Sequence, residues 1–286
     1  MKHKQKQLAL FGLKFHPFRP DVPIEALYPI PAVDAFCRRV EFAVSDGGFV
    51  SITGDPGTGK SVALRLLAHR LGQMRDINVA AIDHPQSRLS DFYREIGDLF
   101  GVPLLNHNRF GSFKALRQRW SEHIASTLTR PVLIIDEAQE MLGTVLNELR
   151  VLSSKEFDSR SLLCVVFAGD QRLPERFRNP DLLPLGSRIR RRLHLDYASR
   201  EDLTATLDQL LTTAGNPELM TTELKTALAE HAAGNFRIMM NMADELLAAG
   251  AEMEVERLDE KLFFDVFSQP APKKPPPRNG RKRAAA

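Results

Sequence analysis

The stretch Gly54-Asp55-Pro56-Gly57-Thr58-Gly59-Lys60-Ser61 decides how this 286-residue chain folds. It matches the pattern GxxxxGK followed by Ser or Thr at every required position. The apolar run Phe49–Thr53 before it predicts a buried strand, and the helical pattern Val62–Ala68 follows it. A strand, a glycine loop and a helix in this order are typical of a loop that binds phosphate groups. The alternative is a chance glycine turn, which the strand and the helix on either side disfavour.

The residue types of this loop suit a nucleotide and its metal ion. Glycines let the backbone curl so that successive N–H groups point at phosphate oxygens, and the following helix presents its N-terminal dipole to the same anion. Lys60 is expected to reach the β- and γ-phosphates, and Ser61 is expected to ligate Mg²⁺ through its hydroxyl group. The expected nucleotide-binding residues are Gly54, Asp55, Pro56, Gly57, Thr58, Gly59, Lys60, Ser61 and Val62.

Further apolar runs predict the rest of an α/β fold. Strands are expected at Ile77–Ile82, Val132–Ile135 and Leu162–Ala168, with a short fifth strand at Leu193–Leu195. A helical pattern separates the first four strands from one another each time, so we expect a parallel five-stranded sheet covered by helices on both faces, a three-layer αβα arrangement. Two helix starts are also expected, with Ser90 as one cap and a capping box at residues 199–202 as the other.

The same patterns divide the chain into four parts. Residues 1–30 contain five prolines and are expected to form an N-terminal arm, and residues 31–197 are expected to form the αβα domain. Four helical patterns predict a small all-helical domain over residues 198–268. The basic, proline-rich residues 269–286 are expected to be a disordered tail.

The charge of the chain is concentrated at its ends. The formal net charge is +3, but residues 1–20 and 271–286 contain only basic charged side chains, and acidic side chains outnumber basic ones in between. Basic ends on an acidic body favour attraction to a polyanion such as DNA or RNA. Solvated termini that keep the protein in solution are an equal alternative.

Composition also points to a cytoplasmic protein. The two cysteines, Cys37 and Cys164, lie in apolar surroundings and are expected to be buried free thiols in a reducing compartment. No metal-ligand spacing of Cys and His occurs. No apolar run reaches membrane-spanning length, and no apolar stretch of secretory-signal type follows the basic N-terminus, so no membrane partner is expected.

The expected strand Val132–Ile135 ends in two acids, which are the partners that a phosphate loop requires. Asp136 is expected to hold Mg²⁺, and Glu137 is expected to polarise the water that attacks the γ-phosphate. An extra helix–strand unit lies between the two motifs, which are about 75 residues apart. If that unit places another strand between them in space, it separates the fold from kinases and small GTPases and favours hydrolases that convert ATP into movement or assembly.

These motifs together resemble the AAA+ ATPases. The resemblance rests on Gly54–Ser61, Leu133–Gln139, the strand end Gly169-Asp170 and Gly234–Arg237, and it covers about residues 8–265. Three stretches resemble more narrowly the ExeA-like group and its relatives, the transposition ATPases TniB, TnsC and Mu B. These stretches are Phe11–Leu13 with Pro17-Phe18, Asp136–Gln139, and Leu149–Ser153.

The resemblance implies roles for three further residues. Asp170 matches a polar sensor of the γ-phosphate that is often Asn, Thr or Gln, and an acid at this place needs a water or a cation between itself and a triphosphate. Arg237 matches the second sensor, which couples the lid domain to the nucleotide, although it could also be an ordinary surface residue at a helix start. Arg188 matches an arginine finger that reaches a neighbouring subunit's nucleotide, and any of Arg190–Arg192 could fill this role, bind DNA phosphates or face solvent.

The function that the resemblance implies is ATP-driven self-assembly, as a ring or a filament, on double-stranded DNA. Such a protein regulates transposition by marking a target and recruiting or activating a transposase. Candidate phosphate contacts besides the tail are Arg88, Arg109 and Lys155. The alternative is a secretion-assembly ATPase of the ExeA type, for which a membrane segment and a wall-binding domain are expected; the sequence shows neither. A signalling NTPase, a third possibility, is expected to carry effector or repeat domains.

Overall fold

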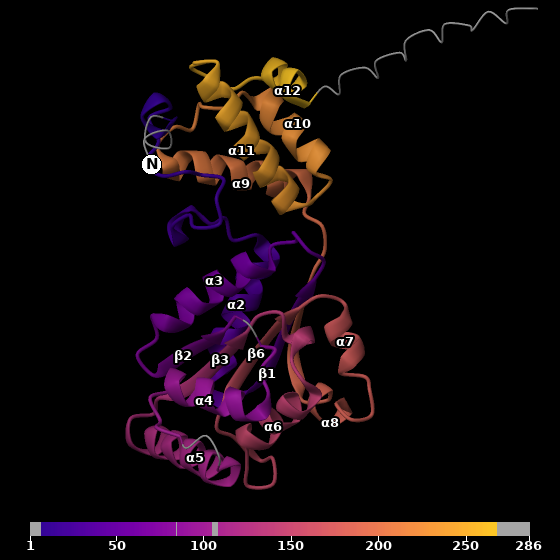
Figure 1. Cartoon of the computed structure of the whole chain (residues 1–286). Coiled ribbons are helices and arrows are strands. Elements are labelled where there is room, and N and C mark those ends of the chain that lie inside the picture. The colour runs from indigo at the N-terminus through magenta and orange to yellow at the C-terminus, as the bar shows by residue number, and fades with distance from the viewer. Residues whose placement is uncertain (1–6, 84, 105–107, 268–286) are drawn as a thin grey trace, which may run out of the picture.

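The computed structural model describes residues 7–83, 85–104 and 108–267 of the chain (Figure 1). A body built around a β-sheet forms the lower part of the view, and a cluster of helices lies above it. The predicted basic tail lies outside the described residues, as do Lys2, Lys4 and Lys6. No helix among the described residues is long and apolar enough to cross a membrane.

The body contains the predicted parallel five-stranded sheet. Its strand order is β2-β3-β6-β1-β7, and every neighbouring pair is parallel. β6 therefore lies between β1, which leads into the phosphate loop, and β3, which ends in the two acids, so another strand does separate the two motifs in space. The strand of the extra helix–strand unit, β2, lies at the edge of the sheet. The strands are β1 Gly48–Gly54, β2 Ile77–Ile82, β3 Arg130–Ile135, β6 Cys164–Gly169 and β7 Ile189–Leu195.

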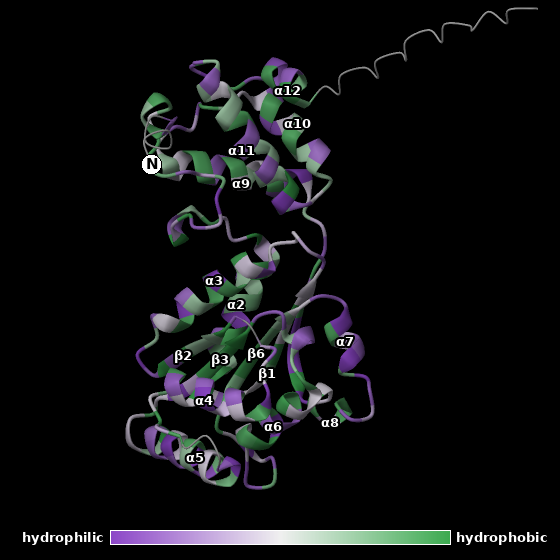
Figure 2. Cartoon of the chain, viewed as in Figure 1, coloured by the Kyte–Doolittle hydropathy of each residue, from purple (hydrophilic) through white to green (hydrophobic). Residues whose placement is uncertain are grey.

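Helices cover both faces of this sheet, because successive side chains of each buried strand point to opposite faces. In β3, Leu133 and Ile135 pack into one core with helices α4, α5 and α6, whereas Val132 and Ile134 pack into a second core with α2 and α3. Figure 2 shows the strands as hydrophobic over most of their length and the helices as mixed. The helices are α2 Pro31–Ala43, α3 Lys60–Gly72, α4 Leu89–Leu99, α5 Arg109–Ser126 and α6 Gly143–Ser153.

Four helices form the predicted helical domain, which has its own hydrophobic core. They are α9 Arg200–Ala214, α10 Thr222–Ala232, α11 Phe236–Glu252 and α12 Glu260–Phe267. The predicted cap at the start of α9 is confirmed, since the Ser199 hydroxyl accepts from the Asp202 N–H at 3.1 Å. The predicted cap at Ser90 is wrong. The helical backbone of α4 already begins at Leu89, and Arg88 occupies the capping position without a side-chain bond.

The segment before α2 packs against both the body and the helical domain. Phe11, Leu13 and Phe18 belong to the core of the helical domain. Val22, Ala26 and Leu27 belong to the core of the body. This segment includes the short 3₁₀ helix η1, Ile24–Ala26. The Arg65 guanidinium of α3 donates to the carbonyls of two of its residues, Pro20 and Val22. The segment therefore runs between the two parts of the molecule and is bonded to both.

Two features between β3 and β7 were not predicted. A short antiparallel hairpin follows α6. Its strands, β4 Ser154–Lys155 and β5 Arg160–Ser161, have two residues each. The edge strand β7 begins at Ile189, four residues before the predicted start, because one side of an edge strand faces water and tolerates arginines. Three short helices complete this region: η3 Ala138–Glu140, α7 Arg172–Arg176 and α8 Leu183–Gly186. A third 3₁₀ turn, η2 Val44–Asp46, precedes β1.

Candidate functional site

A cavity of about 450 Å³ lies between the body and the helical domain. Its polar lining includes the phosphate loop with Lys60, and Glu137, Asp170 and Arg237. The rest of the lining is mainly apolar and comes from the N-terminal segment, α9 and α11. It includes Val22, Leu27, Tyr28, Leu210 and Met240. A cavity that combines a cationic loop with a mainly apolar lining suits a nucleotide, which carries both phosphate groups and an aromatic base.

The phosphate loop has the backbone shape that the glycines predicted. Gly57 and Gly59 have φ angles of +87° and +96°, in the left-handed region that side chains with a Cβ rarely adopt. The Thr58 hydroxyl donates to the Asp55 carbonyl at 2.8 Å and closes the turn. All loop residues from Pro56 to Val62 line the cavity.

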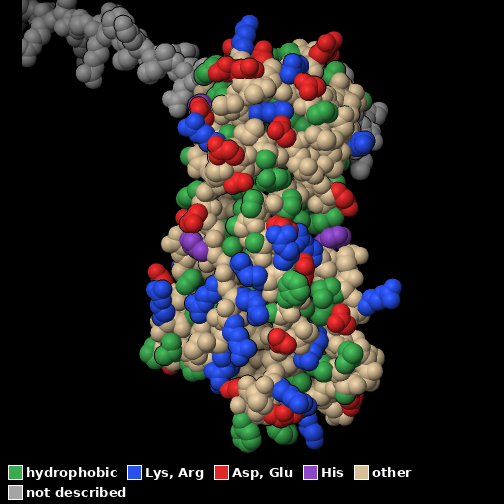
Figure 3. Space-filling view, turned by 180° about the vertical axis from the view of Figure 1, so that it is seen from behind, with side chains coloured by type: hydrophobic (Ala, Val, Ile, Leu, Met, Phe, Trp, Pro, Cys, Tyr) green, Lys and Arg blue, Asp and Glu red, His purple; other side chains and the backbone are tan. Residues whose placement is uncertain are grey.

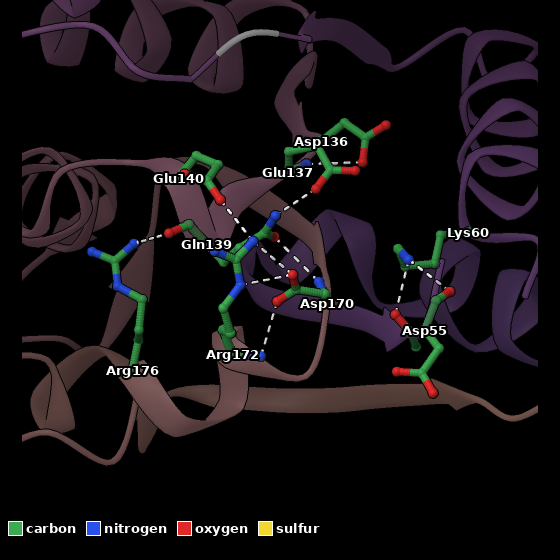
Figure 4. A network of polar contacts seen from close by, with 10 residues as sticks. Asp55, Lys60, Asp136, Glu137, Gln139, Glu140, Asp170, Arg172 and Arg176 are labelled. Atoms are coloured by element: carbon green, nitrogen blue, oxygen red, sulfur yellow. Dashed lines mark hydrogen bonds and ion pairs between the residues drawn. The ribbon is translucent and has the colours of Figure 1, made fainter. Parts of the chain in front are cut away.

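The Lys60 ammonium group is buried against the phosphate loop. Its Nζ donates to the carbonyls of Gly54 at 2.8 Å and Asp55 at 3.0 Å (Figure 4). Lys60 is 8% exposed, although lysine is rarely buried without a paired charge. The loop therefore holds an ammonium charge in a site that can bind an anion.

Asp136 lies at the end of β3, close enough to Lys60 to be affected by its charge. Burial raises the pKa of Asp136, while the Glu137 N–H, which donates to its Oδ1 at 2.9 Å, and the Lys60 charge oppose that rise. A buried carboxylate whose charge is poorly solvated is stabilised by a bound cation. The described residues contain no cluster of three or more His, Cys, Asp or Glu side chains that could hold a metal. Mg²⁺ is usually bound by one or two protein groups together with phosphate oxygens. Of the two predicted ligands, Ser61 lines the cavity and Asp136 is not among its lining residues.

Glu137 lines the cavity and has an unusual backbone. Its φ is +49°, in the left-handed region, although it carries a side chain. Its carboxylate accepts a hydrogen bond from the Gln139 amide. The motif resemblance included Gln139 without giving it a role, and nothing in its spacing indicated this contact.

Asp170 lies at the end of β6 and lines the same cavity. Burial alone would raise its pKa, but the hydrogen bonds and charge of Arg172 outweigh burial and lower it. Arg172 donates to Asp170 through its backbone N–H at 2.9 Å and its Nε at 2.8 Å, and it pairs with Glu140 at 2.7 Å. Arg172 thus places a positive charge directly beside the Asp170 carboxylate. The sequence did not single it out.

Arg237 reaches the cavity from the first turn of α11. It forms no ion pair with an acid among the described residues. A cation in the first turn of a helix is disfavoured by the helix dipole, so helix stability does not explain an arginine there. An anion in the cavity would explain it.

The helical domain touches the phosphate loop just before Arg237. The Phe236 N–H donates to the Gly57 carbonyl at 2.9 Å, and the Asn235 amide donates to the Pro56 carbonyl at 3.0 Å. Asn235 also caps α11 by accepting from the N–H groups of Arg237 and Ile238. A loop whose N–H groups face a phosphate site leaves its carbonyls for such outside partners. The two parts of the molecule are therefore linked at the loop itself.

Arg188 is not brought into this site. It precedes β7, where Ile189 lies beside Phe49, whereas the phosphate loop follows Gly54, which lies beside Leu195. Six residues of strand, at about 3.3 Å each, place Arg188 about 20 Å from the loop. Its guanidinium pairs with Asp158 of the β4–β5 hairpin and donates to the Pro184 carbonyl.

The three residues named as DNA contacts lie on different elements. Arg109 begins α5 and pairs with Glu148, which is buried and also accepts from Tyr93. Arg88 is exposed before α4, and Lys155 is half-buried in the hairpin. The Arg109–Glu148 pair gives Arg109 a structural partner inside the chain.

Comparison with known proteins supports the fold and its phosphate-binding motif. Residues 43–177 match the family model described as "AAA domain". The General secretion pathway protein A of Aeromonas hydrophila is 32% identical over 209 residues, which are 72% of this chain and 37% of that protein. The chain therefore spans little more than a third of this relative.

Solved structures share the fold at low sequence identity. The ORC2 protein of Aeropyrum pernix, in ADPNP–ADP complexes, has a TM-score of 0.69 at 17% identity, with 90% of this chain and 72% of that chain covered. The ORC1 protein of Aeropyrum pernix in complex with DNA has a TM-score of 0.62 at 14% identity, with 88% and 68% covered. The sheet order, the phosphate loop, the helical domain and these similarities together show that the chain has the AAA+ P-loop fold, with an AAA domain over residues 43–177.

Proposed function

We propose that the chain is a cytoplasmic, Mg²⁺-dependent ATPase that converts ATP and water to ADP and phosphate. Residues 54–62 bind the nucleotide, and Ser61 and Asp136 hold Mg²⁺ with phosphate oxygens. Glu137 orients and activates the attacking water, while Asp170 with Arg172 and Arg237 respond to the γ-phosphate. The observation that carries this proposal is that Lys60, Glu137, Asp170 and Arg237 meet at one cavity.

Phosphate release on incubation with ATP and Mg²⁺ tests this activity. Lys60→Ala is expected to lose nucleotide binding, because the loop loses its only ammonium charge. Glu175→Gln, an exposed acid on α7, is the matched control and is expected to behave as wild type. A Lys60→Ala protein that hydrolyses ATP at the wild-type rate contradicts the proposal.

We infer that the chain works as an assembly of copies of itself. Arg188 lies too far along the sheet to meet the nucleotide of its own chain, so it is useful in catalysis only at a neighbour's site. A guanidinium supplied by a neighbour stabilises the charge of the transition state and makes hydrolysis depend on assembly. Arg188→Ala is expected to abolish the rise in ATPase rate per chain with protein concentration.

We propose double-stranded DNA as the surface on which the protein assembles. The rear view in Figure 3 shows Lys and Arg side chains running down the middle of the lower body. The AAA+ fold is shared with an ORC1 protein solved with DNA. The motif resemblance to transposition ATPases further suggests a regulator that recruits or activates a transposase.

Binding to a labelled non-specific duplex with ATP, ADP or no nucleotide, at two salt concentrations, tests the DNA proposal. Tight binding that requires ATP and weakens with salt is expected, because contacts to phosphates release counterions. Absence of binding in every nucleotide state contradicts it. The chain would then fit the second candidate, a secretion-assembly ATPase. Its 32% sequence identity to the General secretion pathway protein A of Aeromonas hydrophila favours this candidate.

A further inference from the structure

We propose that Gln139 is a positioning residue that fixes the carboxylate of Glu137 and couples it to the end of β6. This role rests on the proposed function, in which Glu137 activates the attacking water. Gln139 lies in η3, directly after the two acids at the end of β3. It is 6% exposed and does not line the cavity, so it does not act on the nucleotide directly.

The side-chain amide of Gln139 connects two strand ends. Its Nε2 donates to Oε2 of Glu137, and its Oε1 accepts from the backbone N–H of Asp170 at 3.2 Å. Figure 4 shows the three residues in this arrangement at the ends of β3 and β6. The catalytic carboxylate and the predicted γ-phosphate sensor are therefore joined through one side chain.

Gln139 itself is held in place from two further directions. Its backbone carbonyl accepts from the Arg176 guanidinium of α7. Its Oε1 lies so close to Gly169 that a Cβ on that residue would be 2.4 Å away. Because the acceptor end of the amide is fixed over β6, the donor end must face Glu137.

Only an amide of this length satisfies both partners. The Asp170 N–H needs an acceptor, and the Glu137 carboxylate needs a donor. Glutamate in place of Gln139 keeps the acceptor but puts a second carboxylate against Glu137, and leucine loses both bonds. Glu137 also has a left-handed backbone. Such a backbone costs free energy and persists only where neighbouring contacts hold the residue, and the bond from Gln139 is one of these contacts.

Steady-state ATPase kinetics of the full chain test the role. Gln139→Leu and Gln139→Glu are expected to lower kcat roughly 10- to 100-fold, because a small misplacement of a catalytic group has effects of this order. KM and the Kd of a fluorescent ATP analogue are expected to stay within about threefold, since the phosphate loop is untouched. Gln118→Leu, which removes an exposed glutamine bonded to Glu122 at 2.9 Å, is the matched control and should change nothing.

A double variant separates positioning from a merely structural effect. If Gln139 acts through Glu137, then Gln139→Leu combined with Glu137→Gln is no slower than Glu137→Gln alone. Losses that multiply, or a loss that appears only in KM, overturn the role. Should Gln139→Leu fail to fold in a thermal melt, Gln139→Glu provides the same comparison, because it keeps the bond to Asp170.

The outcomes also distinguish this role from the proposed function. Wild-type kcat in Gln139→Leu, with an inactive Glu137→Gln, overturns the positioning role alone. Wild-type turnover in Glu137→Gln overturns the assignment of the base, and the positioning role with it. A wild-type chain that hydrolyses no ATP overturns the proposed activity itself.

Discussion

Arg188 forms an ion pair with Asp158 of its own chain, at the end of the sheet opposite to the phosphate loop. Asp158 belongs to the turn of the β4–β5 hairpin, where Glu156, Phe157 and Asp158 all have positive φ angles. Phe157 in this turn is fully exposed. In the single chain, Arg188, which we propose reaches a neighbour's nucleotide, is therefore paired with an acid of a strained and exposed turn.

Removing the Asp158 carboxylate is expected to make assembly easier. Asp158→Asn frees Arg188 from an ion pair that competes with its proposed role in a neighbour's site. Partly exposed pairs of this kind contribute about 0.2–1 kcal/mol, so the protein concentration at half-maximal ATPase rate should fall about 1.5- to 5-fold. The measurement is the ATPase rate per chain across a protein dilution series.

A neighbouring acid in the same turn provides the control for Asp158→Asn. The Glu156 carboxylate pairs with Arg160 at 3.2 Å, whereas Arg188 pairs with Asp158, so Glu156→Gln should leave the half-maximal concentration unchanged. If Asp158→Asn instead raises the protein concentration at half-maximal ATPase rate, the ion pair with Asp158 helps Arg188 to act in the neighbour's site. That result contradicts the competition argued here.

Glu137→Gln is expected to trap the ATP-bound assembly. The amide keeps the size of the side chain but cannot take a proton from water, so kcat should fall on the order of 100-fold or more. ATP binding should persist, because Lys60 and the loop are unchanged. Sedimentation with ATP should show larger particles for this variant than for wild type, and wild-type turnover would rule out Glu137 as the base.

The two buried thiols make folding sensitive to alkaline pH. Burial raises the pKa of Cys37 to about 11 and that of Cys164 to about 12, whereas an unfolded thiol has a pKa of about 8.5. Above pH 8.5 the unfolded chain loses these protons before the folded chain does, so stability should fall as pH rises.

Thiol labelling and denaturant melts measure this behaviour separately. Native protein at pH 8 should react slowly with a thiol reagent, and urea should expose two reactive thiols. The urea midpoint should decrease between pH 8 and pH 10, and a Cys37→Ala, Cys164→Ala double variant should show a smaller decrease. Fast labelling of the native protein would contradict burial of both groups.

The sequence was sufficient wherever a pattern is local. The phosphate loop follows from its glycine and lysine pattern. Four of the strands and the helices of the helical domain follow from the spacing of their apolar side chains. The extra helix–strand unit raised the possibility of a strand between the two motifs, but it did not indicate that this strand is β6. The start of β7 was missed because Arg190–Arg192 are polar, and only their place at a sheet edge makes them strand residues.

The parts of the site that the sequence did not reveal depend on contacts between distant segments. Gln139 meets Asp170, and Arg172 meets Glu140, only after β3 and β6 become neighbours. Asn235 binds the phosphate loop across 179 positions of sequence. Neither periodicity nor a motif of a few residues carries information about such pairs.

The contact between the phosphate loop and the helical domain leads to a prediction for Gly57. A Cβ at this position would lie 2.1 Å from Oδ1 of Asn235, and the φ of +87° disfavours any side chain. Gly57→Ala must therefore strain the loop, at a cost of about 1–3 kcal/mol, or displace Asn235, which also caps α11. Binding of a fluorescent ATP analogue should weaken roughly tenfold or more.

Two companion variants separate the loop from the lid in this experiment. Asn235→Ala removes the bond to Pro56 and the cap of α11 but leaves the loop backbone free of strain. It should therefore show only the part of the Gly57→Ala effect that comes from the lost contact between the loop and the helical domain. Gly72→Ala, at the end of α3 where a Cβ meets nothing, should bind as wild type. If Gly57→Ala also binds as wild type, the loop tolerates a side chain, and the close packing of Asn235 on the loop is not needed for nucleotide binding.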